Sequence, residues 1–179
     1  MKHIFDLDNT LVYTDEANNL AYNTALVKEG LELIAAPGRI TRGTVAEAYP
    51  ELTAERLARI ISHKEAVYSV ETTYVNDCLL QLAKRQGRDS CFIWSSANPA
   101  RASAVVEYHG LREWFSGLYF SKKADIRQEV EELFRYFSFS PRDVVVYEDT
   151  DPYIQELRSI GITVVDVKDL SRAQREAIR

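Results

Sequence analysis

The sequence predicts an α/β protein with a doubly wound parallel sheet and a helical insertion after the first strand. Three observations support this fold class. From residue 91 onward, short apolar runs alternate with segments of helical period, which is typical of βαβ units. About 85 residues without a convincing strand separate the first apolar run from the second. Acidic residues directly follow two of the runs, at the positions where parallel sheets bind ligands.

Five apolar runs are expected to form the strands. Each is bounded by polar or turn residues and is rich in β-branched or aromatic residues, which indicates burial on both faces. The runs are His3–Phe5, Cys91–Trp94, Leu118–Phe120, Val144–Tyr147 and Ile162–Val165. If their chain order across the sheet is 3-2-1-4-5, the first and fourth strands are neighbours where the strand order reverses.

Segments of helical period connect the later strands and fill the early gap. The later helices are expected at 99–109, 124–137, 151–160 and 170–178, and the early ones at 16–29, 44–48, 53–68 and 74–86. Thr53 suits a helix start and Gly87 a helix end. The sequence therefore predicts a sheet domain of residues 1–12 and 74–179, and an all-helical domain of residues 13–73.

Composition excludes several functional classes. The chain has 179 residues, 46% of them hydrophobic, and a formal charge of −5, which argues against a surface for duplex nucleic acid. No apolar run approaches the roughly 20 residues that cross a bilayer, and Asp6 comes too early for a secretion segment. Cys78 and Cys91 supply neither a disulfide framework nor a four-ligand zinc site. We therefore expect a cytoplasmic protein with two buried thiols.

The strongest functional signal is the pair of aspartates after the first strand. Asp6 and Asp8 are one residue apart, and alternate side chains of an extended segment share a face. Like charges so close need a cation or hydrogen-bond donors, although a turn capped by Asp6 is the structural alternative. Glu148, Asp149 and Asp151 follow the fourth strand. Asp151 suits the N-cap of the next helix, which explains only one of these three acids.

The expected strand order brings the two acidic groups together. Asp6, Asp8 and Asp149 would share a crevice beyond the carboxyl ends of the first and fourth strands. Ligand sets made only of oxygen favour Mg²⁺, which keeps waters and a substrate oxygen in its shell. A bound cation also lets a chain of negative net charge accept an anionic substrate.

Four motifs, in this order, resemble those of the haloacid dehalogenase-like hydrolase superfamily. They are DLDNTLV, FIWSSAN, a lysine, and VVVYEDT followed by YIQELRSIGITVV. The resemblance covers nearly the whole chain, and the helical insertion is similar to the cap of the phosphoglycolate phosphatase and β-phosphoglucomutase branch. It implies Mg²⁺-dependent hydrolysis of a small phosphomonoester (phosphoglycolate, a sugar phosphate or a nucleoside monophosphate) through an aspartyl-phosphate.

Carried over to this sequence, the resemblance implies the catalytic groups. Asp6 would be the nucleophile that attacks phosphorus, and Asp8 the general acid and base. Ser95 would donate to the phosphoryl oxygens. A lysine, Lys122 or Lys123, would offset the charge that develops during transfer.

The lysine of the third motif has two candidates. Counting back from Ser140, before the fourth strand, favours Lys123 over Lys122. In this branch a proline usually follows the lysine, and here Lys123 or Ala124 stands in its place. Both lysines therefore stay open.

The resemblance also implies the metal and substrate ligands. Mg²⁺ would be held by Asp6, the Leu7 carbonyl, Asp8 and Asp149. Glu148 would sit beside the metal-binding aspartate without contacting the ion.

Substrate contacts are expected from both domains. Ser96 and Asn98 would add donors at the start of a helix, a position that favours anions. Asn18 and Arg42 would reach the substrate from the helical domain, whose residues would set specificity.

Departures from the family patterns rank the alternatives. The presence of Asp8 disfavours dehalogenation, and Asn18 replaces the cap histidine of the mutase pattern. Phosphonate cleavage uses a cap lysine, and Lys28 and Lys64 stand in no recognisable pattern. Phosphoryl transfer to a sugar hydroxyl and a non-catalytic phosphate-binding module stay as alternatives. The oligomeric state is open.

Overall fold

The computed structural model describes residues 1–170. The chain divides into two compact units, one of Met1–Val12 with Val75–Arg179 and the other of Tyr13–Tyr74. The second unit extends one residue beyond the segment 13–73 that the sequence predicts to be all-helical. That it acts as a cap over a site stays a prediction.

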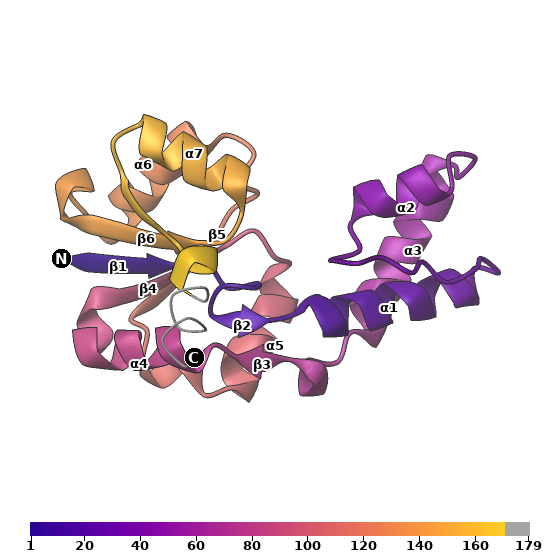
Figure 1. Ribbon diagram of the computed structural model, residues 1–179, viewed down its shortest axis with the longest axis horizontal. Coiled ribbons are helices and arrows are strands. Elements are labelled where there is room, and N and C mark those ends of the chain that lie inside the picture. The colour runs from indigo at the N-terminus through magenta and orange to yellow at the C-terminus, as the bar shows by residue number, and fades with distance from the viewer. Residues whose placement is uncertain (171–179) are drawn as a thin grey trace. The chain divides into compact units, whose positions relative to one another are not determined.

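A five-stranded parallel sheet forms the centre of the first unit (Figure 1). β1 (Lys2–Phe5) lies between β4 (Cys91–Ser95) and β6 (Val144–Glu148), with β5 (Gly117–Phe120) and β7 (Thr163–Asp166) at the two edges. In chain order these five strands are arranged 3-2-1-4-5, which confirms the predicted sheet. The neighbours β1 and β6 are therefore the two strands that end in acids.

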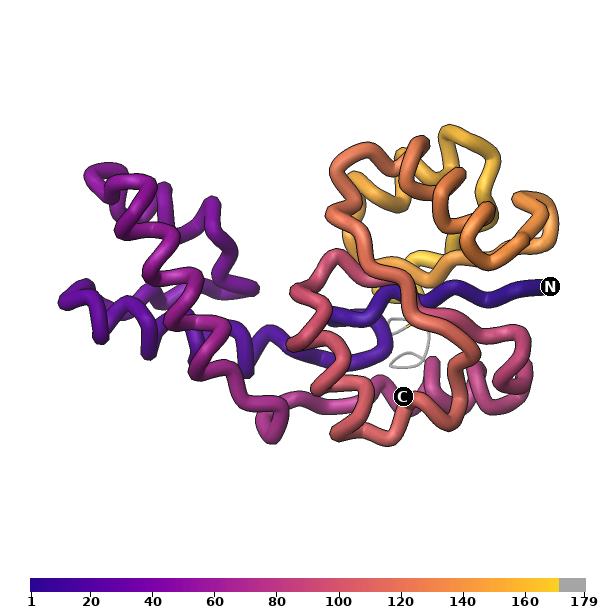
Figure 2. Tube along the Cα trace, turned by 180° about the vertical axis from the view of Figure 1, so that it is seen from behind, coloured from indigo at the N-terminus to yellow at the C-terminus, as the bar shows by residue number. Residues whose placement is uncertain are grey.

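Helices cover both faces of this sheet (Figures 1 and 2). α6 (Ile126–Phe137) and α7 (Asp151–Ser159) lie on one face, and α4 (Asp77–Gln86) and α5 (Pro99–Tyr108) on the other. Alternate strand residues point to opposite faces. The core beneath α6 and α7 consists of Ile4, Phe92, Trp94, Ile126, Val130, Leu133, Phe134, Val144, Val146, Leu157 and Ile162. Burying each large apolar side chain stabilises the fold by about 1.5–3 kcal/mol.

Two short strands and one helix start differ from the sequence prediction. β2 (Val12–Tyr13) pairs with β3 (Tyr74–Val75), so the expectation of no strand in the early gap is wrong. Two residues are too few to show a period. The helix expected from residue 74 begins at Asp77, because the Asn76 side chain accepts the N–H of Leu79 (3.4 Å) and caps it.

The structure corrects the expected roles of Asp151 and Cys78. Asp151 is the first residue of α7 and Thr150 precedes it as N-cap, so Asp151 interacts with the helix dipole instead of capping the helix. Cys91 is buried as expected, whereas Cys78 is partly exposed, and neither cysteine forms a disulfide. The closing helix expected at 170–178 lies outside the described residues, apart from Leu170.

The helices of residues 1–170 are all too short or too polar to span a bilayer.

The second unit is built from three helices with a core of their own. They are α1 (Asp15–Lys28), α2 (Arg42–Ala48) and α3 (Ala54–Val67), followed by the 3₁₀ turn η1 (Val70–Thr72). The core consists of Tyr22, Ala25, Leu26, Ile40, Val45, Leu57 and Ile60. As expected, the Thr53 hydroxyl accepts a backbone N–H (3.2 Å) at the start of α3.

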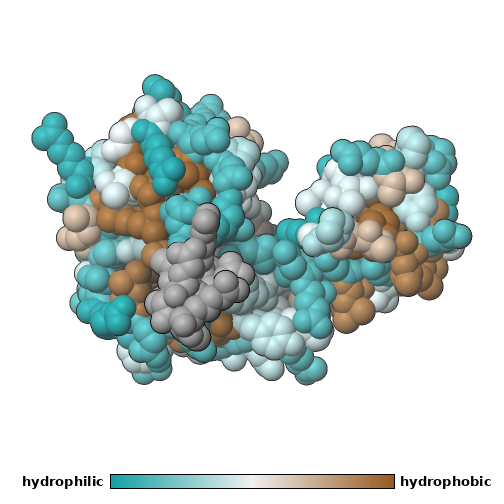
Figure 3. Space-filling model, viewed as in Figure 1, coloured by the Kyte–Doolittle hydropathy of each residue, from teal (hydrophilic) through white to brown (hydrophobic). Residues whose placement is uncertain are grey.

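Hydrophobic side chains also reach the surface of this unit, where Figure 3 shows them gathered near α1. Leu20 and Val27 are 56% and 58% exposed. They lie two helical turns apart on the side of α1 opposite its buried residues.

Candidate active site

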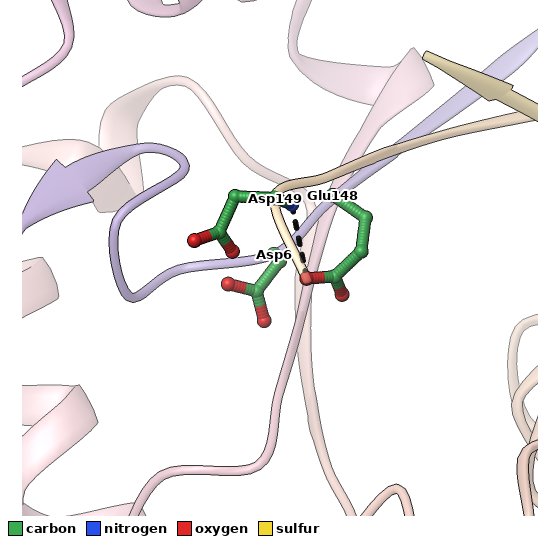
Figure 4. Close-up of side chains that lie close together, drawn as sticks. All are labelled: Asp6, Glu148 and Asp149. Atoms are coloured by element: carbon green, nitrogen blue, oxygen red, sulfur yellow. Dashed lines mark hydrogen bonds between the residues drawn. The ribbon is translucent and has the colours of Figure 1, made fainter. Parts of the chain in front are cut away.

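Acids from two neighbouring strands meet at the carboxyl edge of the sheet (Figure 4). Asp6 directly follows β1, Glu148 ends β6, and Asp149 is the next residue. Each offers a carboxylate oxygen, and the three oxygens lie within 4.8 Å of one another. Asp6 and Glu148 are 7% and 1% exposed, and Asp149 is partly buried. The structure thus brings together two of the three acids that the strand order was expected to gather.

The backbone after β1 forms a tight turn that places Asp6 at this edge. The N–H of Asp6 donates to the Tyr147 carbonyl (2.9 Å), which continues the pairing of β1 with β6. Asn9 adopts a left-handed φ of 61°, which asparagine tolerates better than most residues. Its N–H donates to the Val12 carbonyl (2.7 Å) and closes the turn.

Lys123 is the lysine that reaches the acids. Its side chain is 1% exposed, and its Nζ lies 2.6 Å from Oδ1 of Asp6 and 2.6 Å from Oε2 of Glu148. Lys122 is exposed and lines a neighbouring pocket instead. Of the two candidates in the sequence, the structure therefore places Lys123 in the cluster.

Burial and ion pairing act in opposite directions on these groups. Burial raises the pKa of the Asp6 carboxyl well above its usual range, although the Lys123 ammonium opposes this. Burial lowers the pKa of Lys123, but the carboxylates of Asp6 and Glu148 outweigh it, so that pKa is raised. Burial and the adjacent Glu148 raise the pKa of Asp149 to about 6. Three acids share one ammonium here, and a divalent cation would relieve the surplus of negative charge.

The donor set fits a hard divalent cation. Carboxylate oxygens are the ligands that Mg²⁺ prefers. Both Glu148 oxygens already have partners: Oε2 binds Lys123, and Oε1 accepts the N–H groups of Asp149 and Thr150, each at 3.1 Å. That Glu148 lies beside an ion held by Asp6 and Asp149 stays a prediction.

Among residues 1–170, two other predicted metal ligands lie outside the cluster of Asp6, Glu148 and Asp149. The Leu7 carbonyl accepts the N–H of Val12 (3.0 Å) within the turn. The Asp8 carboxylate binds Arg101, with Nη1 3.4 Å from Oδ1 and Nη2 3.3 Å from Oδ2. Metal binding by Leu7 and Asp8 stays a prediction.

The second motif lies where β4 leads into α5. The buried Ser95 hydroxyl accepts the N–H of Ala97 (3.1 Å). Asn98 caps α5 by accepting the N–H groups of Ala100 (2.9 Å) and Arg101 (3.3 Å). An open pocket of about 330 Å³ lies here, lined by Ser96, Ala97, Asn98, Pro99, Phe120, Ser121 and Lys122. Substrate contacts of Ser95, Ser96 and Asn98 stay predictions.

The two predicted substrate contacts of the helical unit have different surroundings. Asn18 is 2% exposed, and its amide donates to the Ile40 carbonyl (2.7 Å), so it holds the loop before α2. Arg42 is exposed at the first position of α2. Their contact with a substrate stays a prediction.

Two charged residues that contact the site residues carry no motif in the sequence. Arg101 binds Asp8 from the first turn of α5. Glu129, in the first turn of α6, accepts the N–H groups of the Lys123 segment. An arginine or a glutamate in the first turn of a helix is common, so nothing in the sequence separates Arg101 and Glu129 from surface residues. Only their contacts in the folded protein do so.

The chain is similar in sequence to a known protein and in fold to several solved structures. No family model matches the chain. The chain is 27% identical over 180 residues to the fructose-1-phosphate phosphatase YqaB of Escherichia coli strain K12, across 92% of this chain and 95% of that protein.

Solved structures share the fold. A haloacid dehalogenase-like hydrolase from Streptococcus pneumoniae matches with a TM-score of 0.75 at 15% identity, over 92% of this chain and 83% of that one. A predicted phosphoglycolate phosphatase from Haemophilus somnus 129PT gives a TM-score of 0.75 at 16% identity, over 92% and 84%. A predicted phosphatase from Clostridium acetobutylicum gives 0.68 at 15% identity, over 98% of both chains. The resemblance indicated by the four motifs is confirmed, and the branch stays a prediction.

Proposed function

Because the chain has the fold of the haloacid dehalogenase-like hydrolases, we propose that it is a cytoplasmic, Mg²⁺-dependent phosphomonoesterase acting through an aspartyl-phosphate on Asp6. The observation that carries this proposal is the buried contact between Asp6 and Lys123, 2.6 Å long, at the ligand-binding edge of the sheet. Burying the charges of Asp6 and Lys123 away from water is costly. Residues whose pKa is shifted in this way cluster at functional sites.

In the first half-reaction, Asp6 attacks phosphorus. Lys123 binds Oδ1 of Asp6, so Oδ2 is the oxygen that we assign to the attack. The new oxygen–phosphorus bond forms as the bond to the leaving alcohol breaks, and the alcohol oxygen takes a proton from Asp8. The Lys123 ammonium offsets the negative charge that develops on the phosphoryl group.

In the second half-reaction, water attacks the phosphorus of the aspartyl-phosphate. Asp8 takes a proton from this water, the bond between phosphorus and Asp6 breaks, and inorganic phosphate leaves. Arg101 binds both Asp8 oxygens and so limits the orientations of that carboxylate.

The acids that we assign to Mg²⁺ are Asp6 and Asp149, with the Leu7 carbonyl and Asp8 as further proposed ligands. When bound, Mg²⁺ supplies positive charge that orients and neutralises the phosphoryl oxygens. Glu148 positions Lys123 through the 2.6 Å ion pair and holds the start of α7 through two backbone N–H groups.

The substrate that we propose is a small sugar phosphate. The similarity to a fructose-1-phosphate phosphatase supports this choice over phosphoglycolate or a nucleoside monophosphate. Ser95, Ser96 and Asn98 would bind the phosphoryl oxygens. The helical unit would act as a cap that excludes bulk water, with Asn18 and Arg42 as substrate contacts.

A phosphate-release assay on the purified chain tests the proposal. With Mg²⁺, fructose 1-phosphate and other sugar phosphates should be hydrolysed faster than phosphoglycolate and nucleoside monophosphates. Chelation should stop release, and added Mg²⁺ should restore it. Phosphorylated product that appears only with added sugar would favour the transferase alternative. If no compound were cleaved by the wild-type protein, the phosphate-binding module would replace the enzyme.

A further inference from the structure

The backbone of Lys123 is held in an unfavourable conformation. Its φ is +50°, in the left-handed region that costs a residue with a side chain roughly 1–2 kcal/mol. Asn9 and Ser138 also have positive φ among the described residues, but Asn9 is of a type that tolerates it and Ser138 ends a helix. Lys123 is neither a residue type that favours positive φ nor the end of a helix, so its φ must be fixed by contacts with other residues.

The segment before Lys123 is anchored to the sheet. The N–H of Ser121 donates to the Ser95 carbonyl (3.2 Å), and its hydroxyl accepts the indole N–H of Trp94 (2.8 Å). These bonds fix where the chain leaves β5. They do not involve residues 123–125, whose backbone conformation determines the direction of the Lys123 side chain.

Glu129 supplies the missing constraint. Its Oε2 accepts the N–H of Lys123 (2.7 Å), and its Oε1 accepts those of Ala124 (2.8 Å) and Asp125 (3.2 Å). Burial raises the pKa of Glu129, but the Ser121 hydroxyl and the three backbone N–H groups more than offset this, so the pKa is lowered. The carboxylate is therefore charged, and hydrogen bonds to a charged acceptor are about twice as strong as neutral ones.

Capping of α6 alone does not explain this carboxylate. Asp125 is the N-cap residue, and its own side chain accepts the N–H of Gln128 (3.1 Å). Glu129 binds three consecutive N–H groups, and two of them, those of Lys123 and Ala124, precede the N-cap residue of α6. Its bonds therefore fix the backbone that carries the lysine.

We propose that Glu129 is a positioning residue that holds the Lys123 backbone in the left-handed conformation from which Nζ reaches both Asp6 and Glu148. This inference rests on the proposed function, because Glu129 would influence phosphoryl transfer only through Lys123. Glu129 itself touches neither the acids nor the proposed nucleophile's attacking oxygen.

Glu129→Ala and Glu129→Gln test the kinetic effect, with Glu131→Gln as the control. Glu131 is an exposed residue of the same helix. Glu129→Ala should lower kcat by about 10–100-fold, the usual loss when a supporting contact is removed, with KM changed less than threefold. Glu129→Gln should lose less, because an amide oxygen still accepts hydrogen bonds. The control should match the wild type, and melting curves should show that all variants are folded.

A double-mutant cycle separates positioning from general destabilisation. In a Lys123→Met background, measured by single turnover, Glu129→Ala should reduce the rate less than twofold further. A further tenfold loss would show that Glu129 acts independently of the lysine, and the proposal would fail.

A crystal structure of Glu129→Ala tests the inference without any turnover. Residue 123 should leave the left-handed region, and Nζ should move out of hydrogen-bond reach of Asp6. An unchanged Lys123 would overturn the positioning role even if activity fell. Because this measurement needs no substrate, it also decides the matter if the wild type cleaves no phosphate ester and the proposed function is wrong.

Discussion

The ion pairs of Lys123 in the sheet unit and of Glu29 in the helical unit differ in how far they are buried. In the sheet unit, Lys123 lies between Asp6 and Glu148, and the three side chains are 1%, 8% and 1% exposed. In the low dielectric of a protein interior, the cost of removing such charges from water can exceed their mutual attraction. A core of apolar residues would serve the fold at least as well.

In the helical unit, the ion pairs of Glu29 have arginine partners that reach water. Glu29, at the end of α1, pairs with Arg56 (3.6 Å) and Arg59 (3.2 Å) of α3, whose side chains are 36% and 55% exposed. His63 lies 3.5 Å from the same carboxylate. Exposed pairs of this kind contribute little to stability. The comparison supports the proposed chemical role of the buried Lys123 cluster, whereas the ion pairs of Glu29 connect two helices.

The most severe test of this contrast is Asp6→Asn. An amide oxygen does not attack phosphorus as a carboxylate does, so we expect kcat to fall by more than about 10³-fold. Lys123 keeps its ion pair with Glu148, so the variant should stay folded. Phosphate release and a melting curve measure the two effects. Activity above a tenth of the wild-type value would remove Asp6 as the nucleophile.

Lys123→Met comes next, and Lys122→Met is its matched control. We expect the Lys123 variant to lose about 10²–10³-fold in kcat, because charge on the phosphoryl group is no longer offset. It should also unfold at lower denaturant concentration, since removal of one partner from a buried pair typically costs about 3–5 kcal/mol. The exposed Lys122 should tolerate the change in both assays. Equal losses in the two variants would contradict the assignment of Lys123.

The same two lysines show where sequence reasoning ends. Continuous apolar runs predicted all five strands of the central sheet to within about one residue, because burial on both faces demands such runs. Adjacent lysines look alike in a sequence, and only the φ of +50° at Lys123 sends that side chain inward. The contacts of Arg101 and Glu129 are likewise products of tertiary folding, made by helices whose sequences contain no unusual pattern.

Arg101→Met should have a smaller effect that depends on the leaving group. The guanidinium binds both oxygens of Asp8, and its loss would let that carboxylate rotate. We expect kcat/KM for a sugar phosphate, which reports the steps up to formation of the aspartyl-phosphate, to fall about tenfold, by the usual cost of a lost supporting contact. An aryl phosphate needs little protonation of its leaving oxygen, so its kcat/KM should change less than threefold. An equal loss of kcat/KM on both substrates would contradict an effect through Asp8 as the acid that protonates the leaving oxygen.

Glu29→Gln should have the smallest effect and should leave kcat unchanged. Its hydrogen bond with Arg59, with help from the charges of Arg59, His63 and Arg56, holds the pKa of Glu29 below its ordinary value of 4.5. A carboxyl whose pKa is lowered by folding stabilises the protein above its unfolded pKa, and this contribution disappears as pH falls through the folded pKa. At pH 7 the variant should therefore melt about 1 °C lower, and the two melting temperatures should converge as pH falls below the lowered pKa of Glu29. A gap that persisted in acid would mean that the side chain acts through packing, and a fall in kcat would mean that the helical unit also places its charges for chemistry.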